Sequence, residues 1–447
     1  MRKKKILLIF SLSISTLCFG QGFSLRQCID FATSNNENKK MAGYDLAVAQ
    51  KKVDEQLGTM LPQIDGSGSY TDNLKLSKTV LPGDLLGKPG QNITFSMGTQ
   101  YNASVGLQLT QKIFDPTFSV GLKVAKVNKQ YYQQSLQKML EQTAYNVSSA
   151  YYQCLINAKQ CETLKATLTS SKKLLSTNEL QYKNGMVKKI DVDKIRVSLN
   201  STSSQLDQSE LNYKQSLNTL KYQMGMPVEK QIVLTDSTAT DIDINEANLV
   251  INDKLNVDDL IDYQLQKTNM DVQELQKRQT IRSYLPTLNF SANYNYNAMG
   301  SEFNFMGKTW YNTYSIGLTL KVPIFDGFQK KSKIAQSKFT ILKAQENIRL
   351  TEQSIKVDVS NYEIQYKDAI DNIHNEKDNL DLAQSVYNTT QLQYKQGVSS
   401  ALDLVQAESS LRESQNNYFN KLFSLFIARL DLEKSKGTLM NYINNFK

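Results

Sequence analysis

The sequence has little of what most enzymes and metalloproteins use. Its 447 residues include one histidine, one tryptophan and four cysteines. The single histidine, His374, lies in a polar segment that we expect to be a solvent-exposed helix. We find no metal-ligand cluster, phosphate-binding loop, nucleophile elbow or glycine-rich dinucleotide motif in the sequence. We therefore expect no catalysis, no cofactor and no bound metal.

Long apolar runs are absent beyond the N-terminus. Residues 1–20 carry a basic start, an apolar core and a small-residue end, the pattern of a secretory signal peptide. A lipoprotein signal with Cys18 as the modified residue is the alternative. No later run approaches the ~20 apolar residues of a membrane-spanning helix. Removing Arg2 and Lys3 to Lys5 lowers the formal charge from +9 to +5, a modest surplus that does not indicate a nucleic-acid partner.

Proline and glycine are missing from two long stretches, apart from one glycine in each, Gly185 and Gly397. Glycine ends helices because it accepts a positive φ. Each stretch is therefore predicted to be two long helices that fold back on each other at the glycine. The two predicted helical hairpins span 116–225 and 328–437.

The sequence around these glycines is duplicated. Leu180–Met186 recurs as Leu392–Val398 at an offset of 212, and Ile113–Asp115 recurs as Ile324–Asp326. The duplication predicts a tandem structural repeat. Its parts are a first repeat at 21–225, an inter-repeat linker at 226–256, a second repeat at 257–440 and a C-terminal tail at 441–447.

Each repeat is predicted to begin with a helix, at 23–60 in the first repeat, followed by two segments in which apolar and polar residues alternate. The alternating segments are 62–71, 101–114, 286–297 and 311–324. A loop rich in turn-forming residues joins the first two. Segments of about ten residues with one strictly polar face are typical of transmembrane β-strands. A half-buried sheet in a soluble domain gives the same alternation and is the alternative.

Four strands are too few to close a barrel. An open sheet edge cannot lie in lipid, because its backbone amides would lack hydrogen-bond partners. If these strands span a membrane, several copies of the chain must therefore share one barrel.

The predicted hairpins carry a second pattern, apolar residues at a spacing of seven. The positions are Leu140, Val147, Cys154, Cys161, Leu168 and Leu175 in the first hairpin, and Val359, Tyr366, Ile373, Leu380 and Tyr387 in the second. This spacing indicates left-handed supercoiling against neighbouring helices. A hollow column of helices would show it, and so would the coiled-coil stalk of an exported adhesin.

Several of these features together resemble the TolC-like outer-membrane efflux proteins over residues 23–440. They are the signal peptide, the two strand pairs, the repeated Ile-Phe-Asp, and the duplicated Tyr-Lys-x-Gly with an aspartate six residues after the glycine. The resemblance implies a membrane α+β fold, in which a trimeric, twelve-stranded outer-membrane β-barrel takes four strands from each chain. This barrel would continue into a long periplasmic α-helical coiled-coil barrel.

The resemblance also implies partners and site residues. The homotrimer would contact outer-membrane lipid, a periplasmic adaptor protein and, through the adaptor, an inner-membrane transporter. The tip loops that would meet the adaptor are Gly185, Met186, Val187, Gly397, Val398 and Ser399. The residues that would line or close the periplasmic aperture are Asp403, Gln406, Asp191, Tyr394 and Tyr182. Gln406 departs from the enterobacterial pattern, which has a second acid there, and Ser399 stands where a basic residue is expected.

Asp403 has two possible roles. Three copies around a narrow pore would form a carboxylate ring that attracts cations. Alternatively, Asp191 and Asp403 stabilise the N-termini of the returning helices as caps. One residue can do both.

From these observations we expect a passive channel, not an enzyme, that exports small molecules across the outer membrane and is gated at the helix tips by adaptor docking. A duct for type I protein secretion and an exported coiled-coil stalk are the alternatives. The sequence names neither the substrate nor the adaptor and pump.

Overall fold

The computed structural model describes residues 22–82, 87, 89–235, 255–304, 307 and 309–445. The predicted signal peptide, with Cys18, and residues 236–254 of the predicted linker lie outside the described residues. The chain divides into two compact units, which we call the helical unit and the sheet unit. The helical unit comprises Met1–Tyr44, Gln134–Gln264 and Arg349–Lys447, and the sheet unit comprises Asp45–Gln133 and Leu265–Ile348.

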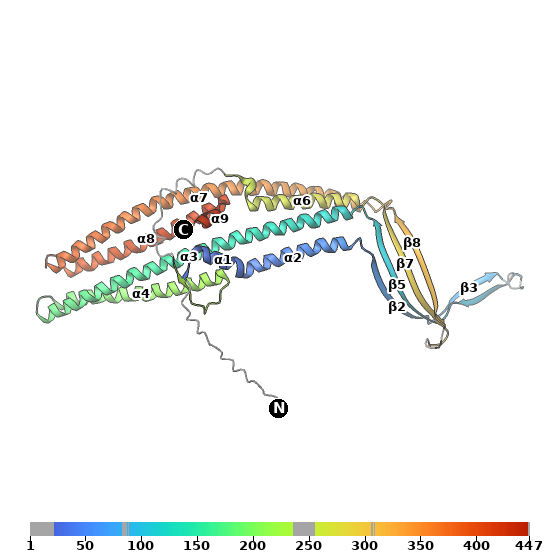
Figure 1. Ribbon diagram of the computed structural model, residues 1–447, viewed down its shortest axis with the longest axis horizontal. Coiled ribbons are helices and arrows are strands. Elements are labelled where there is room, and N and C mark those ends of the chain that lie inside the picture. Colours follow the sequence, from blue (N-terminus) through green and yellow to red (C-terminus); the bar gives the residue numbers. More distant parts are fainter. Residues whose placement is uncertain are drawn as a thin grey trace, which may run out of the picture. The chain divides into compact units, whose positions relative to one another are not determined.

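Two helical hairpins make up most of the helical unit (Figure 1). Helix α3 (Phe118–Lys183) turns back into α4 (Lys189–Met224), and α7 (Gln329–Lys395) turns back into α8 (Ala401–Lys436). Helix α3 has 66 residues and is therefore about 100 Å long at 1.5 Å per residue. The N-terminal parts of α3 and α7 belong to the sheet unit.

The positions at a spacing of seven face the interior of the helical unit. Val147, Cys154, Val359, Tyr366 and Ile373 are all buried. The other members of the two series are buried or half-buried, and none is exposed. Burial of such side chains stabilises a helix pair by roughly 1.5–3 kcal/mol each relative to exposure. The apolar spacing therefore explains why helices of this length pair along their axes.

The main core of the helical unit lies where short elements cover the two hairpins. Helices α1 (Leu25–Asn35) and α9 (Leu439–Asn445) pack there. Next to them the strands β1 (Gly22–Phe23) and β6 (Val233–Leu234) pair in parallel. The ring of Tyr152 stacks on that of Phe426, with their centroids 4.2 Å apart. The 3₁₀ turn η2 (Val257–Asp259) leads into α6 (Ile261–Arg282), whose first residues belong to this unit.

The prediction of one helix over 23–60 is wrong at its middle. The chain forms α1 and then α2 (Glu37–Gly58), separated by Asn36 in an extended conformation. The side-chain oxygen of Asn36 accepts hydrogen bonds from the backbone amides of Asn38, at 2.9 Å, and Lys39, at 3.3 Å. Its Nδ2 donates to the carbonyl of Gln223, at 2.8 Å. Asn36 thus acts as a cap and ties the break to the end of α4.

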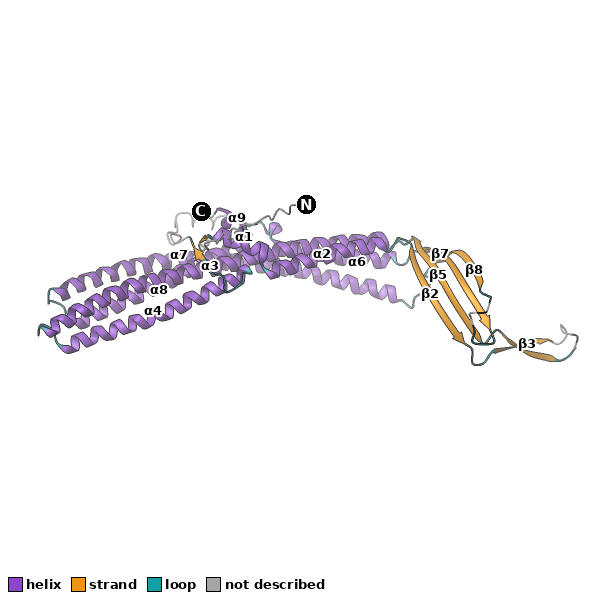
Figure 2. Ribbon diagram, turned by 60° about the horizontal axis from the view of Figure 1, so that its bottom comes forward, coloured by secondary structure: helices purple, strands orange, loops and turns teal. Residues whose placement is uncertain are grey.

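The sheet unit contains four antiparallel strands (Figure 2). They are β2 (Gln63–Asp72), β5 (Tyr101–Phe114), β7 (Thr287–Gly300) and β8 (Tyr311–Lys321), in the order β2-β5-β7-β8. The region between β2 and β5, predicted to be a loop, contains a two-stranded hairpin of β3 (Ser77–Pro82) and β4 (Asn92–Met97). No helix among the described residues is long and apolar enough to cross a membrane.

Candidate functional site: the sheet faces and the helix tips

One face of the four-stranded sheet carries aligned apolar side chains. The register places Ile64, Leu109, Ala292 and Ile316 in one row across the four strands. The next row on the same face is Gly66, Leu107, Tyr294 and Tyr314. Ile64 is 68% exposed and Ile316 is 82% exposed. Large apolar side chains therefore cover a broad surface that the chain itself does not bury, as an interaction surface would.

The opposite face carries polar side chains in the same register. Asp65, Gln108, Asn293 and Ser315 form one row across the strands. The next row on that face is Ser67, Gly106, Asn295 and Thr313. The sheet thus separates a lipid-compatible face from a water-compatible one.

The sheet has two edges that pair with no other strand of the described chain, β2 and β8. Every residue of both strands is exposed. Each edge leaves backbone amide and carbonyl groups free to pair with a further strand.

The two helix tips have the same backbone geometry. Gly185 and Gly397 have φ values of 74° and 76°. After α3, the amide of Gly185 donates to the carbonyl of Tyr182 at 2.9 Å, and that of Met186 to Gln181 at 2.8 Å. After α7, the equivalent amides donate to the carbonyls of Tyr394, at 3.0 Å, and Gln393, at 2.9 Å. Both tips are Schellman caps, which need glycine at the left-handed position.

The space around the tip glycines is open. A Cβ atom added at either Gly185 or Gly397 would meet no atom within 4 Å. The left-handed backbone, rather than crowding within the chain, therefore explains these glycines. Of the predicted docking residues, Met186 is 74% exposed and Val398 is 75% exposed, whereas Val187 and Ser399 are half-buried.

Asp403 caps the first turn of α8, as one of the two interpretations predicted. Ser400 is the N-cap residue, and its hydroxyl accepts from the amide of Asp403 at 3.1 Å. In return, the Asp403 carboxylate accepts from the amide and the hydroxyl of Ser400, at 2.9 and 2.7 Å. The hydroxyl of Ser399 also donates to it, at 3.2 Å. These bonds, those from Ser400 first, lower the pKa of the exposed Asp403 carboxyl, so it stays charged.

Asp191 lies in the first turn of α4, but the preceding N-cap residue, Lys188, makes no side-chain cap bond. Burial, and then the charge of Asp191, raise the pKa of Tyr394, so its phenol remains a hydrogen-bond donor at neutral pH. The Tyr394 hydroxyl donates to the side-chain oxygen of Asn178 on α3. The charge of Asp191 thus acts on Tyr394, whereas Tyr182 is 45% exposed at the other tip.

The bond between Tyr394 and Asn178 joins the two hairpins within one chain. Asn178 was not among the predicted site residues. It is 1% exposed, and its Nδ2 donates to the carbonyl of Leu174 at 2.9 Å. Its spacing of seven from Leu164 and Ser171, a core spacing of supercoiled helices, was the signal in the sequence that could have identified it.

Gln406 is exposed on α8, where it lines a groove between α4 and α8 with a volume of about 450 Å³. Apolar Ile190, Val197 and Leu402 also line this groove, and each is more than half exposed. The groove thus combines polar Gln406 with exposed apolar side chains near the N-terminal ends of α4 and α8.

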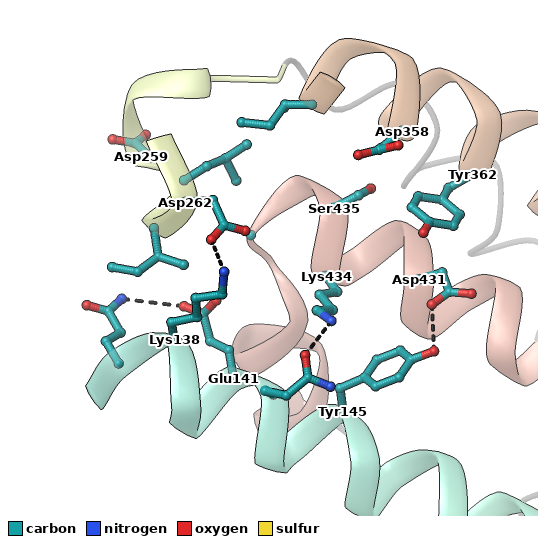
Figure 3. A pocket seen from close by; sticks show the side chains of 16 residues that line it. Lys138, Glu141, Tyr145, Asp259, Asp262, Asp358, Tyr362, Asp431, Lys434 and Ser435 are labelled. Carbon is teal, nitrogen blue, oxygen red and sulfur yellow. Dashed lines mark hydrogen bonds and ion pairs between the residues drawn. The ribbon is translucent and has the colours of Figure 1, made fainter. Parts of the chain in front are cut away.

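A cavity of about 500 Å³ lies elsewhere in the helical unit, between α3, the start of α6, α7 and α8 (Figure 3). Its polar groups largely pair with one another. Lys138 forms an ion pair with Asp262, and the Tyr145 hydroxyl donates to Asp431 at 2.7 Å. Burial raises the pKa of Glu141 and of Asp431. None of the predicted site residues lines this cavity, and its paired groups connect the surrounding helices.

Metal coordination has no candidate in the described part of the chain. No group of three or more histidine, cysteine, aspartate or glutamate side chains there could hold a metal ion.

Comparisons with known proteins agree on one family. The model of the outer membrane efflux protein family matches residues 29–226 and 264–438. The outer membrane protein TolC of Escherichia coli strain K12 is 22% identical over 468 residues, covering 98% of this chain and 87% of that protein. The proteases secretion protein PrtF of Dickeya chrysanthemi is 21% identical over 340 residues, covering 75% of this chain and 71% of that protein.

Solved structures share the fold. The CmeC outer membrane channel of Campylobacter jejuni gives a TM-score of 0.69 at 17% identity, covering 93% of this chain and 86% of that one. The outer membrane protein VceC of Vibrio cholerae gives 0.68 at 16% identity, covering 92% and 96%. The family model matches most of the chain, which confirms the predicted resemblance. The chain therefore belongs to the outer membrane efflux protein family: it is an outer-membrane channel protein with a periplasmic helical part, and not an enzyme.

Proposed function

We propose that the protein is a passive duct that carries small molecules out of the periplasm across the outer membrane. Three copies would form it, each giving four strands to one closed barrel. The observation that carries this proposal is the sheet with one apolar face, one polar face and two unpaired edges in the described chain. Pairing β8 of each copy with β2 of the next would give hydrogen-bond partners to the backbone groups of both edges, as the lipid environment of a membrane requires.

The polar face supports a passive role. Its asparagine, serine, glutamine and threonine side chains would line the lumen, while the rows of Ile64 and Leu107 would face lipid. Such a wall offers hydrogen bonds of a general kind and no enclosed pocket for one substrate. Substrate choice would then belong to an inner-membrane transporter, with which the duct would work through an adaptor.

The exposed tips support gating by an adaptor. Met186 and Val398 project from short loops and are about three-quarters exposed, although both are apolar. Apolar side chains at a protruding tip are suited to burial against a partner. Docking there would favour an open arrangement of the tips if the partner contacted that arrangement more extensively.

Protein secretion is the second candidate, because one relative over three-quarters of the chain is named as a proteases secretion protein. The lumen proposed here suits either cargo. The sheet favours a duct over an exported stalk, because a stalk has no use for a sheet with a lipid-compatible face.

A site-specific photocrosslinking experiment tests the docking step. A photoreactive amino acid replaces Val398 in the tip loop that follows α7 or, as a matched control, Leu382, which is 65% exposed on α7 and lies further from the tip. We expect Val398 to capture a periplasmic adaptor and Leu382 not to. Equal capture at both positions, or none at Val398, would remove the docking assignment. Barrel closure is tested separately, by an unboiled gel of the outer-membrane fraction, where a monomer-sized species would contradict it.

A further inference from the structure

Polar side chains occupy core positions of the two hairpins, where the supercoil pattern favours apolar ones. On α3, Ser171 and Asn178 continue a spacing of seven that begins at Leu164. On α4, Thr202 follows Ile195 by seven. All five residues are buried. Positions of this kind face neighbouring helices, so their polar groups must find partners across the helix interface.

Glu408 on α8 supplies one such partner. It is 3% exposed. The hydroxyl of Ser171 donates to its Oε1 at 2.7 Å, and the hydroxyl of Ser198 donates to its Oε2 at 3.1 Å. One carboxylate therefore connects α8 to both helices of the other hairpin. Hydrogen bonds to an ionised group are stronger than neutral ones, and a buried carboxylate without them would be costly.

Arg412 supplies the second partner, one turn further along α8. It is 8% exposed, and its Nη1 donates to the hydroxyl of Thr202 on α4. Its Nε has no hydrogen-bond partner within the described part of the chain. Buried charged groups of this kind are best attested as devices that fix the register of packed helices.

The layers around Glu408 and Arg412 explain why a register device is needed. Towards the tips, Leu174, Ile195 and Leu404 form a small apolar cluster. Apolar layers that repeat along a helix pair tolerate a slide of α8 by a whole number of turns, because one apolar side chain replaces another. A slide of one turn, about 5.4 Å, would instead take the Glu408 carboxylate away from the hydroxyls of Ser171 and Ser198 and bring it towards these apolar side chains.

We propose that Glu408 and Arg412 are positioning residues, which set the register of α8 against α3 and α4 and thereby hold the tips at Gly185 and Gly397 at a fixed relative height. Both tips are continuous with the helices that the two residues join. The proposal concerns the helical unit alone and does not rest on conduction or adaptor docking.

Double electron–electron resonance on the full-length protein tests the proposal. Nitroxide labels replace Lys183 and Lys395, which are exposed at the ends of α3 and α7. Labelled chains are assembled with an excess of unlabelled chains, so that each assembly reports one intrachain distance. The cysteines Cys28, Cys154 and Cys161 are buried, and a chain without introduced cysteines provides the labelling blank.

The double variant Glu408→Leu with Arg412→Leu separates register from stability. Apolar replacement of a buried charged layer leaves stability unchanged or raises it, so we expect the melting temperature to be retained. We also expect the narrow distance peak of the wild type to broaden or to split, because an axial slide of one turn, about 5.4 Å, changes the distance between labels on neighbouring tips by less than the slide itself. A folded double variant that keeps the narrow peak would overturn the proposal.

A second double variant tests the proposal if the leucine double variant does not assemble. Ser171→Ala with Ser198→Ala removes the donors to Glu408 with little change in volume, and we expect a broadened peak together with a lower melting temperature. An unchanged peak would again overturn the proposal. Glu413→Leu is the matched control, because Glu413 is exposed on the same helix, and it should leave the peak unchanged.

Discussion

The bond between Tyr394 and Asn178 gives the sharpest quantitative prediction for the tips. The substitution Tyr394→Phe removes only the phenolic hydroxyl and leaves the aromatic ring in place. The side-chain oxygen of Asn178 then loses its hydrogen-bond donor from α7. Because Asn178 is 1% exposed, little water can reach this oxygen to replace the lost bond. A buried acceptor without a donor costs about 1–3 kcal/mol.

This cost appears as a change in local opening of the tips. Because each 1.4 kcal/mol corresponds to about a tenfold change in an equilibrium constant, a cost of about 1–3 kcal/mol should raise the open population about 5- to 140-fold. Hydrogen exchange of backbone amides at the ends of α3 and α7, followed by mass spectrometry, measures this population. Backbone amides in the core around Tyr151 and Tyr152, which lie far along the sequence from either tip, should exchange at the wild-type rate.

A double-mutant cycle shows whether the bond itself is responsible. Asn178→Leu replaces the amide with an apolar group of similar size, and we expect the combined variant with Tyr394→Phe to lose less than the sum of the two single changes. The coupling should be about 1 kcal/mol. Additive effects, or unchanged tip exchange in Tyr394→Phe, would refute the assignment of this bond as a link between the hairpins.

Three further predictions concern single side chains. Asp403→Asn should lower cation selectivity in planar bilayers, whereas Ser400→Ala, which breaks the capping box but keeps the charge, should not; unchanged selectivity in Asp403→Asn would leave only the capping role. Gly397→Ala should destabilise its tip by about 1–2 kcal/mol, because alanine is strained at positive φ, and unaltered tip exchange would contradict this. Glu141→Gln should raise the melting temperature at neutral pH, and it should leave the melting temperature unchanged at a pH below 4.5, the ordinary carboxyl pKa. The reason is that burial raises the pKa of Glu141, so its charge in the folded state lowers stability as the pH rises. A difference in melting temperature that does not depend on pH would argue against this cause.

Much of the fold follows from local patterns. A glycine at a left-handed position ends a helix whatever surrounds it, and Gly185 and Gly397 do so with the same pair of backbone bonds. Alternation of side chains similarly predicts strands, and the register aligns Ile64 with Leu109 as the pattern requires. These features depend on neighbours within a few residues, so the sequence carries them directly.

The features that the sequence did not predict depend on distant partners. The break at Asn36 is completed by a carbonyl at Gln223, on a helix 187 residues away. Asn178 gains its role from Tyr394, and Glu408 gains its role from Ser171. Asn36, Asn178 and Glu408 are polar residues in otherwise regular helical patterns. The pattern points to the position in the sequence but does not identify the residue with which its side chain pairs. The β3–β4 hairpin was missed for another reason, because its strands lie within a segment rich in turn-forming residues.

The two free edges of the sheet have a genetic consequence. If copies of the chain close one barrel as proposed, a chain whose β8 is damaged still offers an intact β2, so it would join other copies and then prevent the ring from closing. Such an allele would be dominant, because each defective chain inactivates the normal chains with which it assembles. A lesion in the core around Tyr152, which stops the chain from folding at all, would remove only that chain and would be recessive.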